Sequence, residues 1–465
     1  GRLPVTPEDK RIFSEAQLAQ GWRLACKAVT REAVELAVPV QEQQGFSALA
    51  AEAADEGALS LAADHDYGLA VDIGTTTLAA ALVDCTDGKI LATATAVNSQ
   101  RSFGADVVSR IGAACHGKGK ALQKAVRRDL TRLTKQLLKD HPGTAARCRQ
   151  MAIAANTTML HLLMGWPCDG LGDWPFHPVS LGGKTYRAQE VLGPQSPLAD
   201  ATVTLLPGMS TYVGADITAG IWQCGLASSD DVSLFVDLGT NGEMVLGNKD
   251  QRFIASAPAG PALEGGKLTW GTGSVPGAIC GVRIERGRAK VRTIDHAVPV
   301  GICGTGILEA MAGLVREGLV DETGKLVEPY FHKGFPLAST LDYQRITLSQ
   351  QDIREIQMAK SAIRAGIESL IERSGISRQR IHQVFLAGGF GYYLDPQKAA
   401  VIGLLPADLA ERTTAVGNTS LKGAIGLLTG AVTLEELQAI AAGAEEIVLG
   451  NDEAFQRLYI DYLNF

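Results

Sequence analysis

Two short stretches of this sequence place an aspartate directly before residues that often bind phosphate. In the first, Leu69–Leu82, an apolar run leads into Asp72, and the turn Gly74–Thr77 follows before a second apolar run. A Gly/Thr turn of this kind offers backbone N–H groups and hydroxyls to phosphate oxygens. A carboxylate at the end of a strand can hold a hydrated Mg²⁺ ion. Taken alone, the stretch also fits an ordinary hairpin of two buried strands.

The second stretch, residues 233–247, repeats the order of the first. An apolar run ends in Asp237, the turn Gly239–Gly242 follows, and another apolar run leaves the turn. A duplication on this scale indicates two lobes of like fold, because the repeats of a solenoid are much shorter. Two such turns facing each other would form a clamp for a nucleoside triphosphate and its metal ion. We therefore expect Asp72 and Asp237 to converge on one crevice.

Three further stretches are candidates for the same crevice. A predicted strand ends in the glycines of Leu386–Gly391, where the lack of large side chains would admit a flat ring such as adenine. The turn Gly304–Gly306 precedes a predicted helix, and the start of a helix is a natural anion site. Glu264 follows a Gly-Pro turn. The plainer alternatives are an ordinary strand-to-helix turn at the first stretch and, at the second, small residues that permit close packing.

The residues between these turns predict the elements that position them. Alternating or continuous apolar runs predict strands at Ile90–Val97 and His382–Leu386, and apolar stripes at helical spacing predict helices over Lys118–Asp140 and Gln351–Arg373. Residues 165–210 are rich in Gly and Pro and lack clear periodicity, which predicts an extended connection or a small subdomain. A helix and a final strand at 446–449 are expected near the C-terminus.

Composition and charge restrict the class of protein. The chain has 465 residues, enough for several domain cores, and its net charge of −7 gives no support for nucleic-acid binding. No apolar run reaches about 18 residues, so no membrane span is predicted. The first residues, GRLPVTPEDK, include neither an initiator Met nor a signal core, and we expect them to be the start of a fragment. The eight cysteines form no CxxC pair, as expected for reduced thiols in a cytoplasmic protein.

Taken in order, the motifs resemble those of the acetate and sugar kinase, heat-shock protein and actin superfamily. Its members have an α/β fold of two ribonuclease-H-like lobes with ATP in the cleft between them. The resemblance makes Asp72–Thr77 and Asp237–Gly242 the two phosphate motifs and Leu386–Gly391 the adenosine motif. It also implies connecting helices that begin near Asn156 and Asn418.

The exact residues of the motifs point to one family within this superfamily. GLAVDIGTTT, NSQRSFGADVVSRI, AIAANTTMLHLLMG, YVGADITAGI, FVDLGTNGE, AGPALEGG, GICGTGILEA, AKSAIRAGIESL and FLAGGFG together resemble the reductive activators of corrinoid proteins. Members of that family restore inactive Co(II) corrinoid to Co(I) in an ATP-coupled manner, in methyltransferase or O-demethylase systems. The resemblance covers nearly the whole chain. It implies ATP and Mg²⁺ as cofactors, a corrinoid protein as partner, ferredoxin or flavodoxin as electron donor, weak ATPase activity, and a homodimer.

The resemblance also implies roles for individual residues. Asp72 and Asp237 would hold hydrated Mg²⁺ and position water. The remaining residues would contact phosphates (Gly74, Thr75, Thr76, Thr77, Gly239, Thr240, Asn241, Gly242), adenosine (Gly388, Gly389, Phe390) or other parts of the cleft (Glu264, Gly304, Thr305, Gly306).

The family normally carries an N-terminal ferredoxin-like domain with a 2Fe–2S cluster on four cysteines. Here the segment Gly21–Cys26 resembles the one that bears the last ligand, and the other three would lie ahead of Gly1. One cysteine cannot hold such a cluster, so we expect none in this chain, although the natural protein would carry it with Cys26 as a ligand. The expected layout is a ferredoxin-domain remnant at 1–42, a linker at 43–66, a first lobe at 67–230, and a second lobe with a C-terminal extension at 231–465.

Three other functions stay open at this point. A small-molecule kinase of the same superfamily would need a base for its substrate hydroxyl, and no candidate is better placed than Asp237. A chaperone-like, ATP-driven binding module without a redox role is the second. The third is an activator of 2-hydroxyacyl-CoA dehydratases, although Cys280 and Cys303 do not show an obvious version of its bridged cluster.

Overall fold

The computed structural model describes residues 3–12, 15–19, 21–23, 65–198, 200–388 and 394–465. The chain divides into two compact units, residues 1–44 and 45–465, and each is described by itself. The first contains helices α1 (Pro7–Ile12) and α2 (Glu15–Ala19). Apolar residues at 33–40 also predict a strand. That segment, Cys26 and nearly all of the expected linker lie outside the described residues.

The second unit contains a six-stranded sheet in its first half. The strand order is β3-β2-β1-β4-β6-β5. Strand β1 is antiparallel to β2 and parallel to β4, and β4 is parallel to β6. The strands of this sheet are β1 (Tyr67–Ile73), β2 (Thr77–Asp84), β3 (Ile90–Val97), β4 (Cys148–Ala155), β5 (Lys184–Arg187) and β6 (Thr202–Leu205).

A second six-stranded sheet repeats this plan with the order β16-β15-β7-β8-β9-β17. Strand β7 is antiparallel to β8 and parallel to β15, and β15 is parallel to β16. Thus β7, β8, β9, β15 and β16 occupy the places of β1, β2, β3, β4 and β6. The predicted two-lobed α/β fold is confirmed. The strands are β7 (Val232–Leu238), β8 (Gly242–Gly247), β9 (Arg252–Ala257), β15 (Ile381–Ala387), β16 (Thr413–Gly417) and β17 (Ala444–Glu446).

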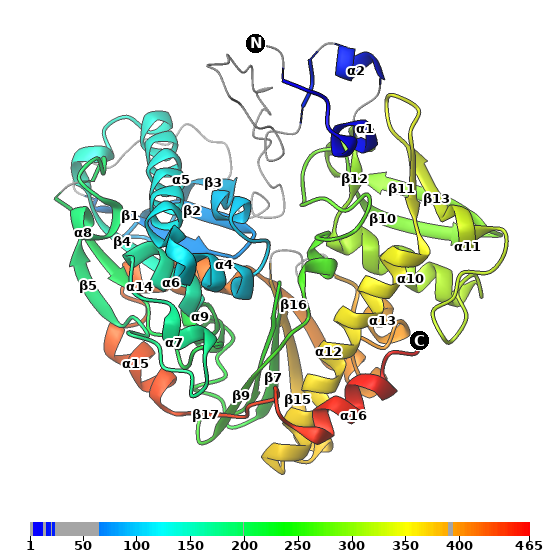
Figure 1. Cartoon of the computed structure of the whole chain (residues 1–465). Helices are drawn as coiled ribbons and strands as arrows, with labels where there is room; N and C mark the ends of the chain where they lie inside the picture. The colour runs from blue at the N-terminus through cyan, green and yellow to red at the C-terminus, as the bar shows by residue number, and fades with distance from the viewer. Residues whose placement is uncertain (1–2, 13–14, 20, 24–64, 199, 389–393) are drawn as a thin grey trace. The chain divides into compact units, whose positions relative to one another are not determined.

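Helices cover the first sheet on both faces (Figure 1). Helix α5 packs on β2 and β3, and its stripe of Leu122, Val126, Leu130, Leu133 and Leu137 is buried as the spacing predicted. The helices of this half are α4 (Val107–Ala113), α5 (Gly119–Asp140), α6 (Thr157–Met164), α7 (Asp169–Gly172), α8 (Ala188–Leu192) and α9 (Ala215–Gln223).

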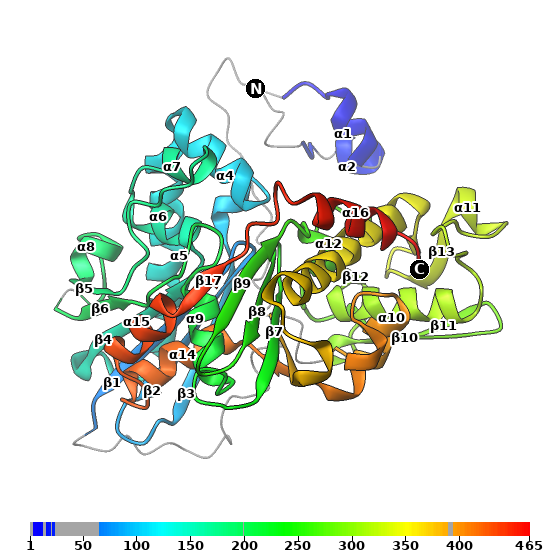
Figure 2. The same cartoon turned by 90° about the horizontal axis from the view of Figure 1, so that it is seen from below.

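Helices α9 and α14 (Thr419–Leu428) pack on each other between the two sheets (Figure 2). Helix α14 contacts β1 and β4, although it follows β16 in sequence. The apolar core here joins both lobes, since it includes Ala70 of β1 and Phe235 of β7. Helices do begin at Asn156 and Asn418, as predicted, since these residues cap α6 and α14. The connecting role predicted for the helix at Asn156 is wrong, because α9 and not α6 packs on α14.

A long insertion separates β9 from β15 in the second half. It adds a small sheet of β10, β11 and β12 and a hairpin of β13 and β14. Helix α12 follows, with a capping box between Ser349 and Asp352. The remaining elements are β10 (Ala278–Glu285), β11 (Arg288–Thr293), β12 (Gly301–Ile302), β13 (Phe335–Ser339), β14 (Arg345–Leu348), α10 (Gly304–Arg316), α11 (Tyr330–Lys333), α12 (Gln350–Ser374), α13 (Pro396–Val401), α15 (Leu434–Ala442) and α16 (Glu453–Asp461).

Two regions differ from the prediction. Residues 165–210, expected to be an extended connection or a small subdomain, instead supply β5 and β6 to the first sheet. These four-residue strands are too short to give a readable alternation. The last strand lies at Ala444–Glu446 rather than at 446–449, and α16 follows it. Among the helices of the described residues, none combines the length and apolar character needed to cross a bilayer.

Candidate functional site: an acidic cleft between two phosphate turns

A cleft between the two lobes brings together the turns that follow β1 and β7. Asp72 and Asp237 both line it, so the two stretches that the sequence paired do converge. Both residues lie near the C-terminal ends of their strands. The duplicated fold therefore places two equivalent turns face to face.

Hydrogen bonds from a buried asparagine fix the conformation of the first turn. Asn98 donates through its backbone N–H to Thr76 O at 3.0 Å and through Nδ2 to Gly74 O at 2.9 Å, and its side chain is fully buried. Asn156 Nδ2 donates to Thr75 Oγ1 at 3.1 Å. A Cβ on Gly74 would lie 2.7 Å from Thr77 O, so this position requires glycine. The turn is thus fixed by residues outside the repeated stretch.

The second turn is fixed by the register of its own hairpin. Asp237 is paired across the strands with Glu243. Asn241 Nδ2 donates to Glu243 Oε1 at 3.2 Å. Gly388 lies against the same strand end with φ +112°, and a Cβ there would lie 2.5 Å from Leu238 O. Only glycine fits this position.

The two turns also meet each other. Thr76 Oγ1 of the first lies 3.5 Å from Thr240 Oγ1 of the second. The carboxylate of Glu264 accepts from Thr240 at 2.7 Å and from Thr76 at 3.3 Å. A single anionic group therefore joins the two phosphate turns.

The start of α14 is bonded to the first aspartate. Asn418 Nδ2 and Ser420 Oγ each donate to the carboxylate of Asp72 at 2.8 Å. Asn418 also caps α14, since its Oδ1 accepts from Leu421 N–H. A segment of the second half of the sequence thereby fixes the rotamer of Asp72.

The cleft is strongly acidic. Among the described residues that line it, five carry a carboxylate and none is Lys, Arg or His: Asp72, Asp216, Asp237, Glu243 and Glu264. Burial raises the pKa of each of them. For Asp216, burial and the charge of Asp72 raise the pKa to about 7. For Asp237, the charges of Asp216, Asp72 and Glu264 raise the pKa further after burial. Such a set of oxygen donors suits a hard divalent cation, whose charge would favour ionisation.

Most of the residues predicted from the sequence line this cleft. Gly242, Thr305 and Gly306 do not. A Cβ on Gly242 would meet Ile363, and one on Gly306 would lie 2.1 Å from Ile279 O, so both glycines permit close packing. Gly389 and Phe390 lie outside the described residues. The predicted residues in the lining are Asp72, Gly74, Thr75, Thr76, Thr77, Asp237, Gly239, Thr240, Asn241, Glu264, Gly304 and Gly388.

Several lining residues were missed. Asp216 lies in the first turn of α9 and Glu243 directly after the second turn, and both occur in stretches that resemble the family, YVGADITAGI and FVDLGTNGE. Glu243, directly after a phosphate turn, was a usable signal, whereas Asp216 could be found only through its place in a stretch that resembles the family. Ser274 and Ser420 had none, because only the fold brings them to the cleft. The missed residues are Ala79, Asn156, Asp216, Glu243, Gly273, Ser274, Asn418, Thr419 and Ser420.

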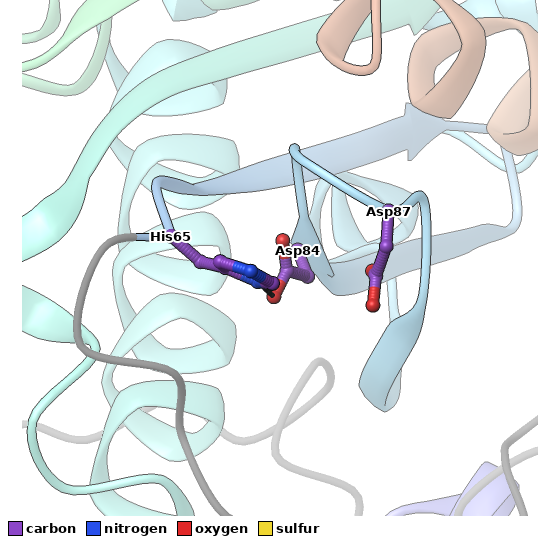
Figure 3. Close-up of side chains that lie close together, drawn as sticks. All are labelled: His65, Asp84 and Asp87. Carbon is purple, nitrogen blue, oxygen red and sulfur yellow. Dashed lines mark hydrogen bonds and ion pairs between the residues drawn. The ribbon is translucent and has the colours of Figure 1, made fainter.

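A second group of potential metal ligands lies at the other end of β1 (Figure 3). His65 Nδ1 lies 2.6 Å from Asp84 Oδ2, and Thr86 N–H donates to Asp84 Oδ1 at 2.9 Å. Both oxygens of Asp84 are thus occupied. Although burial opposes ionisation, these bonds hold the pKa of Asp84 below its usual range. The pair fastens the start of β1 to the end of β2.

Comparisons with known proteins agree with this arrangement. Residues 231–465 match the family "C-terminal domain of RACo the ASKHA domain", and residues 67–229 match "RACo middle region". The chain is 33% identical over 415 residues to the corrinoid activation enzyme RamQ of Eubacterium limosum, covering 85% of this chain and 69% of RamQ. It is 25% identical over 431 residues to the [Co(II) methylated amine-specific corrinoid protein] reductase of Methanosarcina barkeri, covering 86% and 77%.

A solved structure extends the likeness to three dimensions. The structure of a reductive activator for corrinoid, iron-sulfur protein superposes with a TM-score of 0.82 at 34% identity, covering 87% of this chain and 67% of that one. The fold, the duplicated phosphate turns and the sequence therefore lead to the same conclusion. This chain belongs to the RACo family, the reductive activators of corrinoid proteins.

Proposed function

We propose that this chain binds ATP with a divalent cation between its lobes and thereby promotes reduction of Co(II) to Co(I) in a corrinoid protein. The observation that carries this proposal is the meeting of two Asp-bearing phosphate turns in one cleft. Membership of a family of corrinoid activators supplies the reaction. Co(II) would gain one electron from a low-potential donor of the ferredoxin or flavodoxin kind.

The donor set of the cleft fits Mg²⁺. A triphosphate would meet five carboxylates and, among the described lining residues, no basic side chain, so charge repulsion would exclude it unless a cation entered too. When bound through water by Asp72 and Asp237, Mg²⁺ would neutralise these charges and orient the phosphates. The turns Gly74–Thr77 and Gly239–Asn241 supply N–H and hydroxyl donors. Gly388, which lines the cleft at the end of β15, would border the adenosine.

We assign the proton acceptor of a weak ATPase activity to Asp216. Burial and neighbouring charge raise its pKa to about 7, and a base is most effective when its pKa is near the working pH. Asp216 lies in the same cleft as both phosphate turns. It would accept the proton of the water that attacks the terminal phosphate.

ATP drives the reduction only if it binds two conformations of the chain unequally. The two turns belong to different lobes, so a nucleotide held by both favours a closed arrangement, and loss of the terminal phosphate releases it. The closed lobes would form the surface that docks the corrinoid protein. We propose that this docking makes the cobalt easier to reduce, and that the chain acts as a homodimer.

The test is an ATP-dependent reduction. The chain, a Co(II) corrinoid protein and a reduced ferredoxin or flavodoxin are mixed with and without MgATP, and loss of the Co(II) electron paramagnetic resonance signal is followed. We expect Co(I) to accumulate only with MgATP and the wild-type chain, and Asp237→Asn to abolish the effect. The exposed-surface variant Asp250→Asn is the matched control. Equal reduction without ATP would contradict the proposal.

A further inference from the structure

Glu264 occupies the place where the two phosphate turns meet. It ends the short 3-10 helix Pro261–Glu264, and its Oε2 accepts from Thr240 at 2.7 Å and from Thr76 at 3.3 Å. These threonines come from different lobes and are 3.5 Å apart at their hydroxyls. A carboxylate oxygen therefore makes the contacts that a phosphate oxygen would make between the same two turns.

We propose that Glu264 is the residue by which this chain distinguishes ATP from ADP. Its carboxylate holds the slot of the γ-phosphate between the two turns, and only a nucleotide that carries a γ-phosphate displaces it. The inference rests on the proposed binding of ATP in this cleft.

The chemistry of the slot excludes joint occupancy. Each threonine hydroxyl has one proton to donate. Thr76 and Thr240 therefore cannot donate to Glu264 and to a phosphate oxygen at the same time. Two anions at hydrogen-bond distance also repel strongly where burial limits screening by water. ADP has no third phosphate and leaves the Glu264 contacts intact. The two nucleotides thus produce different positions of one side chain.

The backbone after Glu264 transmits such a displacement. Gly265 has φ +84°, and a Cβ there would lie 2.6 Å from Thr272 O; a Cβ on Gly271 would lie 1.9 Å from Gly265 O. The backbone at Gly265 is therefore in direct contact with the segment 271–272. Thr272 N–H donates to Ile302 O at 2.9 Å, and Ile302 N–H donates to Trp270 O at 2.8 Å.

These bonds join the γ-phosphate slot to the inserted sheet. Strand β12, which contains Ile302, is paired with β10. The loop ahead of β12 is also bonded to this sheet, because Val300 N–H donates to Gly277 O at 3.0 Å. A shift of the backbone at Glu264 would therefore press residues 265–272 against β12. The insertion that separates β9 from β15 is thereby sensitive to whether ATP or ADP is bound.

Two plainer roles make different predictions. If Glu264 only ties the lobes together, its loss changes the affinities for ATP and ADP by the same factor. If Glu264 holds the cation of the nucleotide, its loss weakens the binding of ATP more than the binding of ADP. Competition for the γ-phosphate slot alone predicts tighter binding of ATP with little change for ADP.

The experiment measures the ratio of the two dissociation constants. MgATP and MgADP are titrated calorimetrically into the wild-type chain, Glu264→Gln, Glu264→Ala and the control Glu309→Gln. Glu309 is a matched carboxylate outside the cleft lining, bonded to Val282 N–H at 2.9 Å and to Lys398 Nζ at 2.8 Å. Glu264→Gln is isosteric: it removes the charge but keeps an acceptor oxygen for the two threonines, and so preserves the fold. Glu264→Ala removes the side chain from the slot between the two turns.

We expect Glu264→Gln to bind ATP about tenfold more tightly relative to ADP than the wild type does, a typical size for coupling between two groups. Glu264→Ala should shift the ratio in the same direction, and Glu309→Gln should leave it unchanged. An unchanged ratio, or a ratio shifted toward ADP, would overturn the inference while leaving nucleotide binding intact. If the wild-type chain bound neither nucleotide, the proposed function would fail, and the inference with it.

Discussion

At the scale of single residues, the cleft is governed by carboxylates that raise the cost of one another's ionisation. Asp237 faces the charges of Asp216, Asp72 and Glu264 in addition to its own burial. Hydrogen bonds from Ser420 and Asn418 lower the pKa of Asp72 without cancelling the effect of burial. In the nucleotide-free chain this repulsion between carboxylates destabilises the cleft, and binding of a cation or of protons reduces it.

This repulsion predicts how stability depends on pH. The pKa of Asp216 is about 7 in the folded chain against 3.8 for the free side chain, so the folded state binds its proton more tightly. The stabilisation is full below pH 3.8 and is lost as pH rises through 7. Between pH 5 and pH 8 we expect the free energy of unfolding of the wild type to fall by about 2–3 kcal/mol more than that of Asp216→Asn.

Urea unfolding between pH 5 and pH 8 measures this difference. The exposed-carboxylate variant Asp250→Asn serves as the control and should keep the wild-type slope. Addition of Mg²⁺ at pH 8 should restore stability to the wild type. Equal slopes for the wild type and Asp216→Asn would show that the proton is not bound at this residue.

At the scale of elements, helix α14 connects the two halves of the site. It follows β16 in the second sheet but packs on β1 and β4 of the first. Its cap residue, Asn418, donates to Asp72 at 2.8 Å. The helix therefore sets both the packing of the lobes and the orientation of a proposed cation ligand.

Removal of this cap should affect stability and nucleotide binding together. Asn418→Ala loses the N-cap, which costs about 1 kcal/mol of stability, and leaves Asp72 with one donor fewer. We expect MgATP affinity to fall about tenfold, in line with the loss of a hydrogen bond to a charged group. Calorimetric titration and urea unfolding give the two quantities.

Thr433→Ala is the matched control for this variant. Thr433 caps α15 and accepts from Glu436 N–H, and it does not line the cleft. It should lose similar stability and keep wild-type affinity. If the two variants bound MgATP equally well, Asn418 would be a cap and nothing more.

At the scale of the whole molecule, the sequence predicted the duplication and the convergence of the two aspartates, because each phosphate turn is a local pattern. The helices over 119–140 and 350–374 were predictable for the same reason, since their apolar stripes are long. Strands β5 and β6 were not, because four residues give no usable period. Residues such as Asn98 and Ser420 reach the site only through tertiary contacts. Glu243 and Asp216 were only partly predictable, since each lies in or beside a recognisable motif but only the fold shows that it lines the cleft.

The central claim is that the two turns hold one triphosphate and its cation, and a double-mutant cycle tests it directly. MgATP affinity is measured for the wild type, Asp72→Asn, Asp237→Asn and the double variant. We expect each single change to weaken binding by about 10- to 100-fold, and the double variant to lose clearly less than the product, with a coupling of roughly 0.5–3 kcal/mol. If the free-energy losses of the two single variants added up to that of the double variant within about 0.5 kcal/mol, the two aspartates would not share a site. A single variant that binds MgATP as the wild type does would also contradict a shared site.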